Sequence, residues 1–162
     1  EVADEFRQDP VYFRTKGAQK GRDAARVPLP WNSQGTQLGF TSGKSWLPIP
    51  DHWREISIDV QDQEVDSSLN LYRKGIQLRK SALEFDKAIV WQETGADGLL
   101  VFQRGSTLVL LNTSKKSRSY EIAGEIILTS TSAISIEDAR VTLPSASACW
   151  VRCLVWASSS VR

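Results

Sequence analysis

The sequence predicts an α+β fold in which one helix connects a long irregular segment to an antiparallel β domain. Three observations support this class. Residues 1–57 contain many Gly, Pro and aromatic residues without sustained periodicity, residues 66–81 show apolar side chains at helical spacing, and the chain after residue 87 alternates with a period of two. A chain of 162 residues can bury one ordinary core, or a small domain with an appendage.

The irregular segment, residues 1–57, is kept extended or turning by Pro28, Pro30, Pro48 and Pro50. An irregular segment of this length is unusual inside a compact domain. We therefore expect it to be a loop excursion that belongs to a larger scaffold.

The helix is predicted over residues 66–81, with Asp66 or Ser67 as its N-cap. Gly75 inside the helix costs about 1 kcal/mol relative to Ala, so we expect packing to require a small residue there. The wide apolar face of the helix requires a partner surface. It consists of Leu69, Leu71, Tyr72, Ile76 and Leu78.

Seven short strands are predicted after the helix, with turns rich in Gly, Asn and Ser between them. This spacing is typical of an antiparallel sandwich or a Greek-key barrel. Glu137 and Asp138 are expected to form a turn, and residues 157–162 a polar tail. The predicted strands are residues 88–93, 98–103, 107–112, 118–122, 125–129, 139–143 and 148–156.

Composition excludes several classes of function. A net charge of +1 gives no basic surface for nucleic acid, and no apolar run approaches the roughly 18 residues of a membrane span. The one histidine, His52, lies in a Pro-flanked loop, where we expect it on the surface and in neither a metal cluster nor a catalytic triad. We predict no metal and no cofactor.

The two cysteines, Cys149 and Cys153, lie on one face of the last predicted strand. Four residues of strand separate their Cα atoms by about 13 Å, whereas a disulfide requires about 7 Å or less. We expect two buried free thiols, which fits a reducing cytoplasm.

Three collinear blocks of sequence carry a resemblance to a known family. The first reads G-R-D-A-A-R-V-P-L-P-W (21–31) and continues with G-F-T-S-G-K-S-W-L-P-I-P (39–50). The second is the helix S-S-L-N-L-Y-R-K-G-I-Q-L-R-K (67–80), and the third comprises F-Q-R-G (102–105) and L-V-L-L-N (108–112). Together they resemble the C-terminal part of α-glucosidases and oligo-α-1,6-glucosidases of the α-amylase superfamily.

The resemblance implies that residues 1–83 are the final loop and helix of a catalytic (β/α)8 barrel and that residues 84–162 are a C-terminal antiparallel β-sandwich. A complete barrel needs at least about 200 residues. Since the family's catalytic carboxylates lie upstream of the matched segment, we expect a chain that is inactive by itself. The absence of methionine leads us to expect a processed product or an excised fragment.

The function implied is that of a retaining α-glucosidase that hydrolyses terminal α-linked glucose from oligosaccharides. Val27, Leu29 and Pro30 replace the family's Thr, Met and Gln, and Gly75 replaces a Leu. The loss of the threonine hydroxyl and the glutamine amide removes possible hydrogen bonds, so the linkage specificity of the family is not carried over. The choice between hydrolysis and glucosyl transfer is also left open.

The resemblance assigns substrate binding to Arg26, which in the family contacts the glucose unit at the cleaved position. Its guanidinium is always charged and presents a planar fork of donors. The alternative is a structural arginine that pairs with Asp23 or Asp59 on the loop. Arg22 and Asp23 are expected to brace the loop rather than to touch sugar.

No residue of this chain is predicted to be catalytic. Retaining enzymes need two carboxyl groups about 5–5.5 Å apart, and no carboxylate here matches the family's motifs. Asp4, Glu5, Asp9 and Asp23 are expected to lie in a solvated acidic loop.

Aromatic residues leave a second class of function open. Trp31, Trp46 and Trp53 would either stack on sugar faces or pack locally. The alternative function is a non-catalytic β-sandwich module that binds glycans or a protein partner. Its candidate surface residues are Trp91, Trp150 and Trp156.

Overall fold

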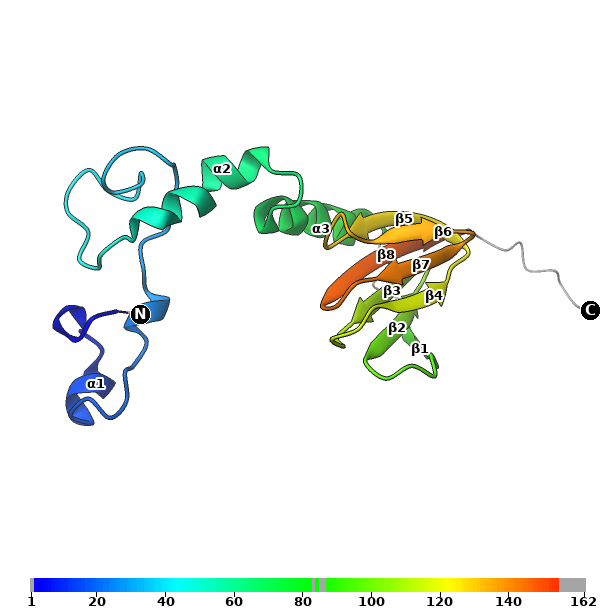
Figure 1. Ribbon diagram of the computed structural model, residues 1–162, viewed down its shortest axis with the longest axis horizontal. Coiled ribbons are helices and arrows are strands. Elements are labelled where there is room, and N and C mark those ends of the chain that lie inside the picture. The colour runs from blue at the N-terminus through cyan, green and yellow to red at the C-terminus, as the bar shows by residue number, and fades with distance from the viewer. Residues whose placement is uncertain (1, 83, 85–86, 155–162) are drawn as a thin grey trace, which may run out of the picture. The chain divides into compact units, whose positions relative to one another are not determined.

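The computed structural model describes residues 2–82, 84 and 87–154 (Figure 1). The chain forms two compact units, Glu1–Leu69 and Asn70–Arg162, and each is described by itself. The domain boundary predicted after residue 83 remains a prediction.

The described part of the first unit contains short helical elements and no strand. The long irregular segment was predicted, but its two short α-helices were missed. A signal for the first helix was present, because Asp9 caps the amide of Val11 and Pro10 occupies the first helical position. The elements are α1 (Pro10–Arg14), α2 (Ile58–Gln63) and the 3₁₀ turns Asp4–Phe6, Asp23–Ala25 and Asp51–Ile56.

Backbone hydrogen bonds hold the Pro-rich segment of the first unit together. Trp31 donates to the carbonyl of Leu38, and Ile58 at the start of α2 donates to the carbonyl of Pro30. Leu38 and Leu47 are fully buried. The segment is therefore ordered by long-range contacts although it has little regular secondary structure.

Helix α3 (Ser68–Ala82) matches the predicted helix within two residues. In Figure 1 it lies beside β5, where Gly75 faces Leu128. A β-carbon at Gly75 would lie 3.6 Å from Leu128, which is ordinary van der Waals contact, so the expectation that packing requires a small residue there is wrong for the described residues. Tyr72 and Ile76 of the predicted buried face are exposed.

The second unit contains two antiparallel sheets. The five-stranded sheet has the order β1-β2-β3-β8-β5, and the three-stranded sheet the order β4-β7-β6. The strands of the larger sheet are β1 (Ile89–Gln92), β2 (Leu99–Arg104), β3 (Thr107–Asn112), β8 (Ser147–Cys153) and β5 (Gly124–Thr129). Those of the smaller sheet are β4 (Arg118–Glu121), β7 (Arg140–Leu143) and β6 (Ser135–Glu137).

All seven predicted strands are present within a few residues, and β6 was missed because it is short, exposed and contains one apolar residue. The predicted turn is displaced by one position. Asp138 and Ala139, with φ of 47° and 62°, connect β6 to β7. Residues 155–156 of the last predicted strand and the predicted tail 157–162 lie outside the described residues.

One hydrophobic core is shared by the two sheets. Alternation along β2, β3 and β8 places every second side chain in it, as a half-buried strand requires. Its fully or nearly buried members are Leu99, Val101, Leu108, Leu110, Ile122, Val141, Leu143, Cys149 and Val151.

Both cysteines are free thiols, as predicted. Cys149 is buried, and burial raises the pKa of its thiol to about 12. Cys153 is only half-buried, and burial raises the pKa of its thiol as well. None of the helices in the described part of the chain has the length and the apolar run that a bilayer crossing needs.

Candidate functional site

Arg26 follows the 3₁₀ turn Asp23–Ala25, and its amide donates to the carbonyl of Asp23 at 3.0 Å. Its guanidinium Nη1 lies 3.5 Å from the carboxylate Oδ2 of Asp9. The Arg26 side chain is 41% exposed, whereas that of Asp9 is 3% exposed. The structural alternative predicted a partner in Asp23 or Asp59, but the carboxylate that Arg26 contacts is Asp9.

Hydrogen bonds to both carboxylate oxygens compensate for the burial of Asp9. Oδ1 accepts from the amide of Val11 at 2.9 Å, and Oδ2 accepts from the amide of Arg22 at 3.0 Å. These two backbone donors, followed by the charges of Arg26 and Arg22, hold the pKa of Asp9 below its ordinary value against the opposing effect of burial. The expectation that Asp9 lies in a solvated acidic loop is therefore wrong.

Asp23 is also buried, so the expectation of a solvated acidic loop is wrong for this residue too. Its Oδ2 accepts from the amides of Gln8 and Asp9, each at 3.0 Å. Asp23 therefore braces the loop as predicted. Its Oδ1 is buried and has no hydrogen-bond partner among the described residues. Asp4 and Glu5, by contrast, are exposed as expected.

Gly21 makes the close approach of these segments possible. Its φ of +69° lies in the left-handed region that favours glycine. A β-carbon on Gly21 would lie 2.6 Å from Cβ and Cγ of Asp9. The glycine that opens the recognised motif is thus required by the position of the Asp9 side chain.

A buried arginine, Arg7, was missed by the sequence analysis. It donates to Asp4 Oδ1 at 2.8 Å, to the carbonyl of Lys20 at 3.0 Å and to the carbonyl of Val2 at 2.6 Å. Its guanidinium also lies over the ring of Tyr12. Nothing in the local pattern indicates this role, because its partners are brought together by the fold.

The first unit thus presents a partly exposed guanidinium whose carboxylate partner is buried. Such a group can donate hydrogen bonds to neutral hydroxyls or to an anion. The described residues contain no group of three His, Cys, Asp or Glu side chains that could hold a metal ion. His52 is exposed, as predicted.

The tryptophans of the first unit divide into two kinds. Trp31 and Trp46 are 52% and 47% exposed. Trp46 lines an open hollow of about 540 Å³ together with Gln37 and Lys44. Trp53 is half-buried and lines a small hollow together with Val27.

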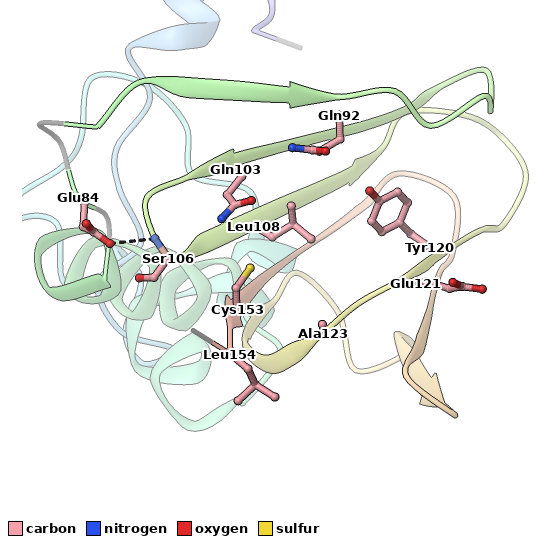
Figure 2. A pocket seen from close by; sticks show the side chains of 10 residues that line it. All are labelled: Glu84, Gln92, Gln103, Ser106, Leu108, Tyr120, Glu121, Ala123, Cys153 and Leu154. Atoms are coloured by element: carbon pink, nitrogen blue, oxygen red, sulfur yellow. Dashed lines mark hydrogen bonds between the residues drawn. The ribbon is translucent and has the colours of Figure 1, made fainter. Parts of the chain in front are cut away.

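The second unit has a separate hollow of about 620 Å³ (Figure 2). Gln92, Gln103 and Tyr120 line it together with apolar side chains. Glu84, also in the lining, accepts a hydrogen bond from the amide of Ser106. The complete lining is Glu84, Gln92, Gln103, Ser106, Leu108, Tyr120, Glu121, Ala123, Cys153 and Leu154.

Of the three tryptophans predicted as a platform, Trp91 and Trp150 lie in one row on the same face of the five-stranded sheet, in register through Phe102 and Val109. Trp91 is 61% exposed on the edge strand β1, where it packs against Phe102. Trp150 is half-buried and faces the groove beside α3. Trp156 lies outside the described residues.

Comparison with known proteins identifies the family. Residues 1–87, more than half of the chain, match the family described as "Alpha amylase, catalytic domain". The chain belongs to the α-amylase family. The matched part of this α-amylase family member includes Arg26, Asp9, Asp23 and Gly21, and the resemblance inferred from its motifs is confirmed.

Sequence relatives of this α-amylase family member are glucosidases. It is 36% identical over 80 residues to an oligo-1,6-glucosidase of Parageobacillus thermoglucosidasius, a match that covers 49% of this chain and 14% of that protein. It is 33% identical over 113 residues to the salivary α-glucosidase of Aedes aegypti, which covers 64% of this chain and 19% of that protein. The matches therefore cover less than a fifth of the length of these relatives.

Solved structures resemble nearly the whole chain. The α-glucosyl transfer enzyme XgtA has a TM-score of 0.73 at 28% identity, over 93% of this chain and 30% of that one. The trehalulose synthase MutB from Pseudomonas mesoacidophila has a TM-score of 0.68 at 21% identity, over 90% of this chain and 28% of that one. The second likeness shows a shared fold, and both chains are more than three times the matched length.

Proposed function

We propose that this chain is the C-terminal part of a retaining α-glucosidase and that Arg26 contacts the terminal α-linked glucose of an oligosaccharide. One observation carries the proposal. Within the segment that matches the α-amylase catalytic domain, Arg26 is held at one end by the buried Asp9 and remains partly exposed at the other. Its remaining donors are available to sugar hydroxyls.

The catalytic carboxylates would come from outside these 162 residues. Asp9 and Asp23 are engaged with backbone amides and are too buried to attack or protonate a glycosidic bond. The chain alone is therefore expected to hydrolyse neither maltose nor isomaltose. Turnover by the 162-residue chain above a buffer blank would contradict the proposal that the catalytic carboxylates lie outside these residues.

In this proposal residues 1–83 form the last loop and helix of a (β/α)8 barrel, and residues 84–162 form a C-terminal β-sandwich. Two antiparallel sheets that share one core support the sandwich. The free thiols Cys149 and Cys153 support a reducing compartment such as the cytoplasm.

The proposal is tested with Arg26→Gln in the intact protein that contains these residues, assayed with maltose and isomaltose. Charge-assisted hydrogen bonds to a substrate contribute about 1.5–3 kcal/mol each, so we expect kcat/KM to fall about 10- to 100-fold. Arg140→Gln is the matched control, because Arg140 pairs with the exposed Glu121 on the smaller sheet. Equal kcat/KM for Arg26→Gln and the control would overturn the role of Arg26.

A second candidate function is a glycan-binding β module. The observation that favours it is the hollow of about 620 Å³, a volume within the usual range of ligand sites, lined by Gln92, Gln103 and Tyr120. Maltooligosaccharide titration of the chain, followed by tryptophan fluorescence, tests it. Saturable binding that Gln92→Ala abolishes would favour this module, and no binding would exclude it.

A further inference from the structure

We infer that Asp9 is a positioning residue that orients the Arg26 guanidinium before the sugar binds. This inference rests on the proposed function of Arg26 and adds a second residue to the same site. The resemblance pointed to Arg26 alone, and Asp9 was expected to be solvated. The structure instead places the Asp9 carboxylate in contact with Arg26, 3.5 Å from its Nη1.

The Asp9 carboxylate is fixed independently of Arg26. One oxygen accepts from the amide of Val11 and caps α1, while the other accepts from the amide of Arg22. Gly21 packs so closely that a β-carbon there would overlap Cβ and Cγ of Asp9. Side-chain rotation of Asp9 would break both hydrogen bonds, so the carboxylate holds one orientation.

The backbone beneath Asp9 is fixed as well. The buried carboxylate of Asp23 accepts from the amides of Gln8 and Asp9. Asp23 therefore fixes the backbone at residues 8 and 9, whereas Asp9 orients the guanidinium of Arg26. Of the two buried carboxylates, Asp9 is the one that contacts the Arg26 side chain.

This arrangement reduces the ordering that Arg26 must undergo on binding. A free arginine side chain has many rotamers, and restricting them costs affinity when a ligand binds. An ion pair to a fixed carboxylate restricts them in advance and leaves the exposed part of the fork for sugar hydroxyls. We therefore expect loss of the Asp9 charge to lower kcat/KM about tenfold, mainly through KM.

The test is a double-mutant cycle with Asp9→Asn and Arg26→Gln in the intact protein, measuring kcat and KM with maltose. Asparagine keeps the size of aspartate, but an NH₂ group in place of Oδ2 can accept from neither the Arg22 amide nor the Arg26 guanidinium. If Asp9 acts through Arg26, Asp9→Asn has no further effect in the Arg26→Gln background. Asp51→Asn is the control, since Asp51 is exposed and pairs with Arg54.

The outcomes separate the two proposals. If Arg26→Gln leaves kcat/KM unchanged, the proposed function fails. If Arg26→Gln lowers kcat/KM while Asp9→Asn does not, or if the two effects multiply in the double variant, Arg26 remains a contact but Asp9 is not its positioning residue.

A spectroscopic measurement tests the same contact should Asp9→Asn fail to fold. In ¹⁵N spectra of the wild-type chain, we expect slow rotation of the Arg26 guanidinium to give separate Nη signals. Arg14, which is exposed, should give averaged signals and serves as the internal reference. Averaged Arg26 signals in the wild-type chain would overturn the inference.

Discussion

Asn112 at the end of β3 is the residue whose replacement should most weaken the β unit. Its side chain is fully buried, and its Nδ2 donates to the carbonyls of Lys116 at 2.8 Å, Leu143 at 3.0 Å and Pro144 at 2.7 Å. Its Oδ1 accepts from both the amide and the hydroxyl of Ser114. One side chain thus connects the β3–β4 turn to the end of β7.

The expected cost of Asn112→Ala follows from these five contacts. The Leu143 carbonyl is reached by a buried hydrogen bond, and leaving such a group without its partner costs about 1–3 kcal/mol. The other four bonds are partly buried, so water can replace them in part. Their loss costs about 0.5–1 kcal/mol in the turn after β3 and about the same in the turn at Pro144. We therefore expect the β unit to lose about 2–5 kcal/mol of its free energy of unfolding.

Native-state hydrogen exchange of the amides in β3 and β8 measures this loss, because it reports the stability of the β unit separately from that of the first unit. Thr113→Ala is the matched control, since the neighbouring hydroxyl makes one exposed bond to Gly98 and should cost less than about 1 kcal/mol. Asn112→Asp should destabilise at least as much as Ala, because it places oxygen against three carbonyls. A loss below about 1 kcal/mol for Asn112→Ala would refute the reasoning.

Three further predictions follow from single sites. Gly75→Ala should raise the free energy of unfolding by about 0.5–1 kcal/mol, measured by urea denaturation, because the helix gains propensity and the new methyl meets Leu128 at an ordinary distance; a loss of stability would contradict this. Hydrogen bonds from Ser57 and Ser33 lower the pKa of Asp59 from 3.8 to about 2, so the ionised carboxylate stabilises the fold fully above pH 3.8 and progressively less as the pH falls towards 2. Between these pH values the free energy of unfolding should therefore fall less steeply for Asp59→Asn than for the wild type, as measured by acid denaturation. Parallel curves would contradict this prediction. Iodoacetamide at pH 8 should modify Cys153 before Cys149 in the folded chain, by mass spectrometry, because Cys149 is buried with a pKa of about 12; equal rates would be inconsistent with the described core.

The helix and strands were predictable because their signals are local. The apolar spacing of α3 and the period-two alternation of β2, β3 and β8 are consequences of backbone geometry that any window of sequence contains. The strand β6 escaped because three exposed residues carry too little alternation. The short helix α1 was not predicted, although Asp9 and Pro10 are residues that commonly begin a helix.

The candidate site was predictable only in part. Arg26 was selected by a motif, whereas its partner Asp9 precedes the motif, and the Asp9 carboxylate accepts from an amide 13 positions along the chain. No pattern of residue types records such a contact. Burial of Asp9 and Asp23 was likewise unexpected, because aspartates in a loop are usually solvated unless backbone amides or a positive charge compensate for the lost water.

The sequence by itself determined the family, the positions of the main helix and of seven strands, and the choice of Arg26, because these depend on residues close to one another along the chain. Only the tertiary structure decided what Arg26 contacts, since folding brings Asp9 beneath the glycine-containing turn at Gly21. The physical reason is that the energies of ion pairs and buried hydrogen bonds depend on distance and on solvent exclusion, and both are set by the fold rather than by the order of residues.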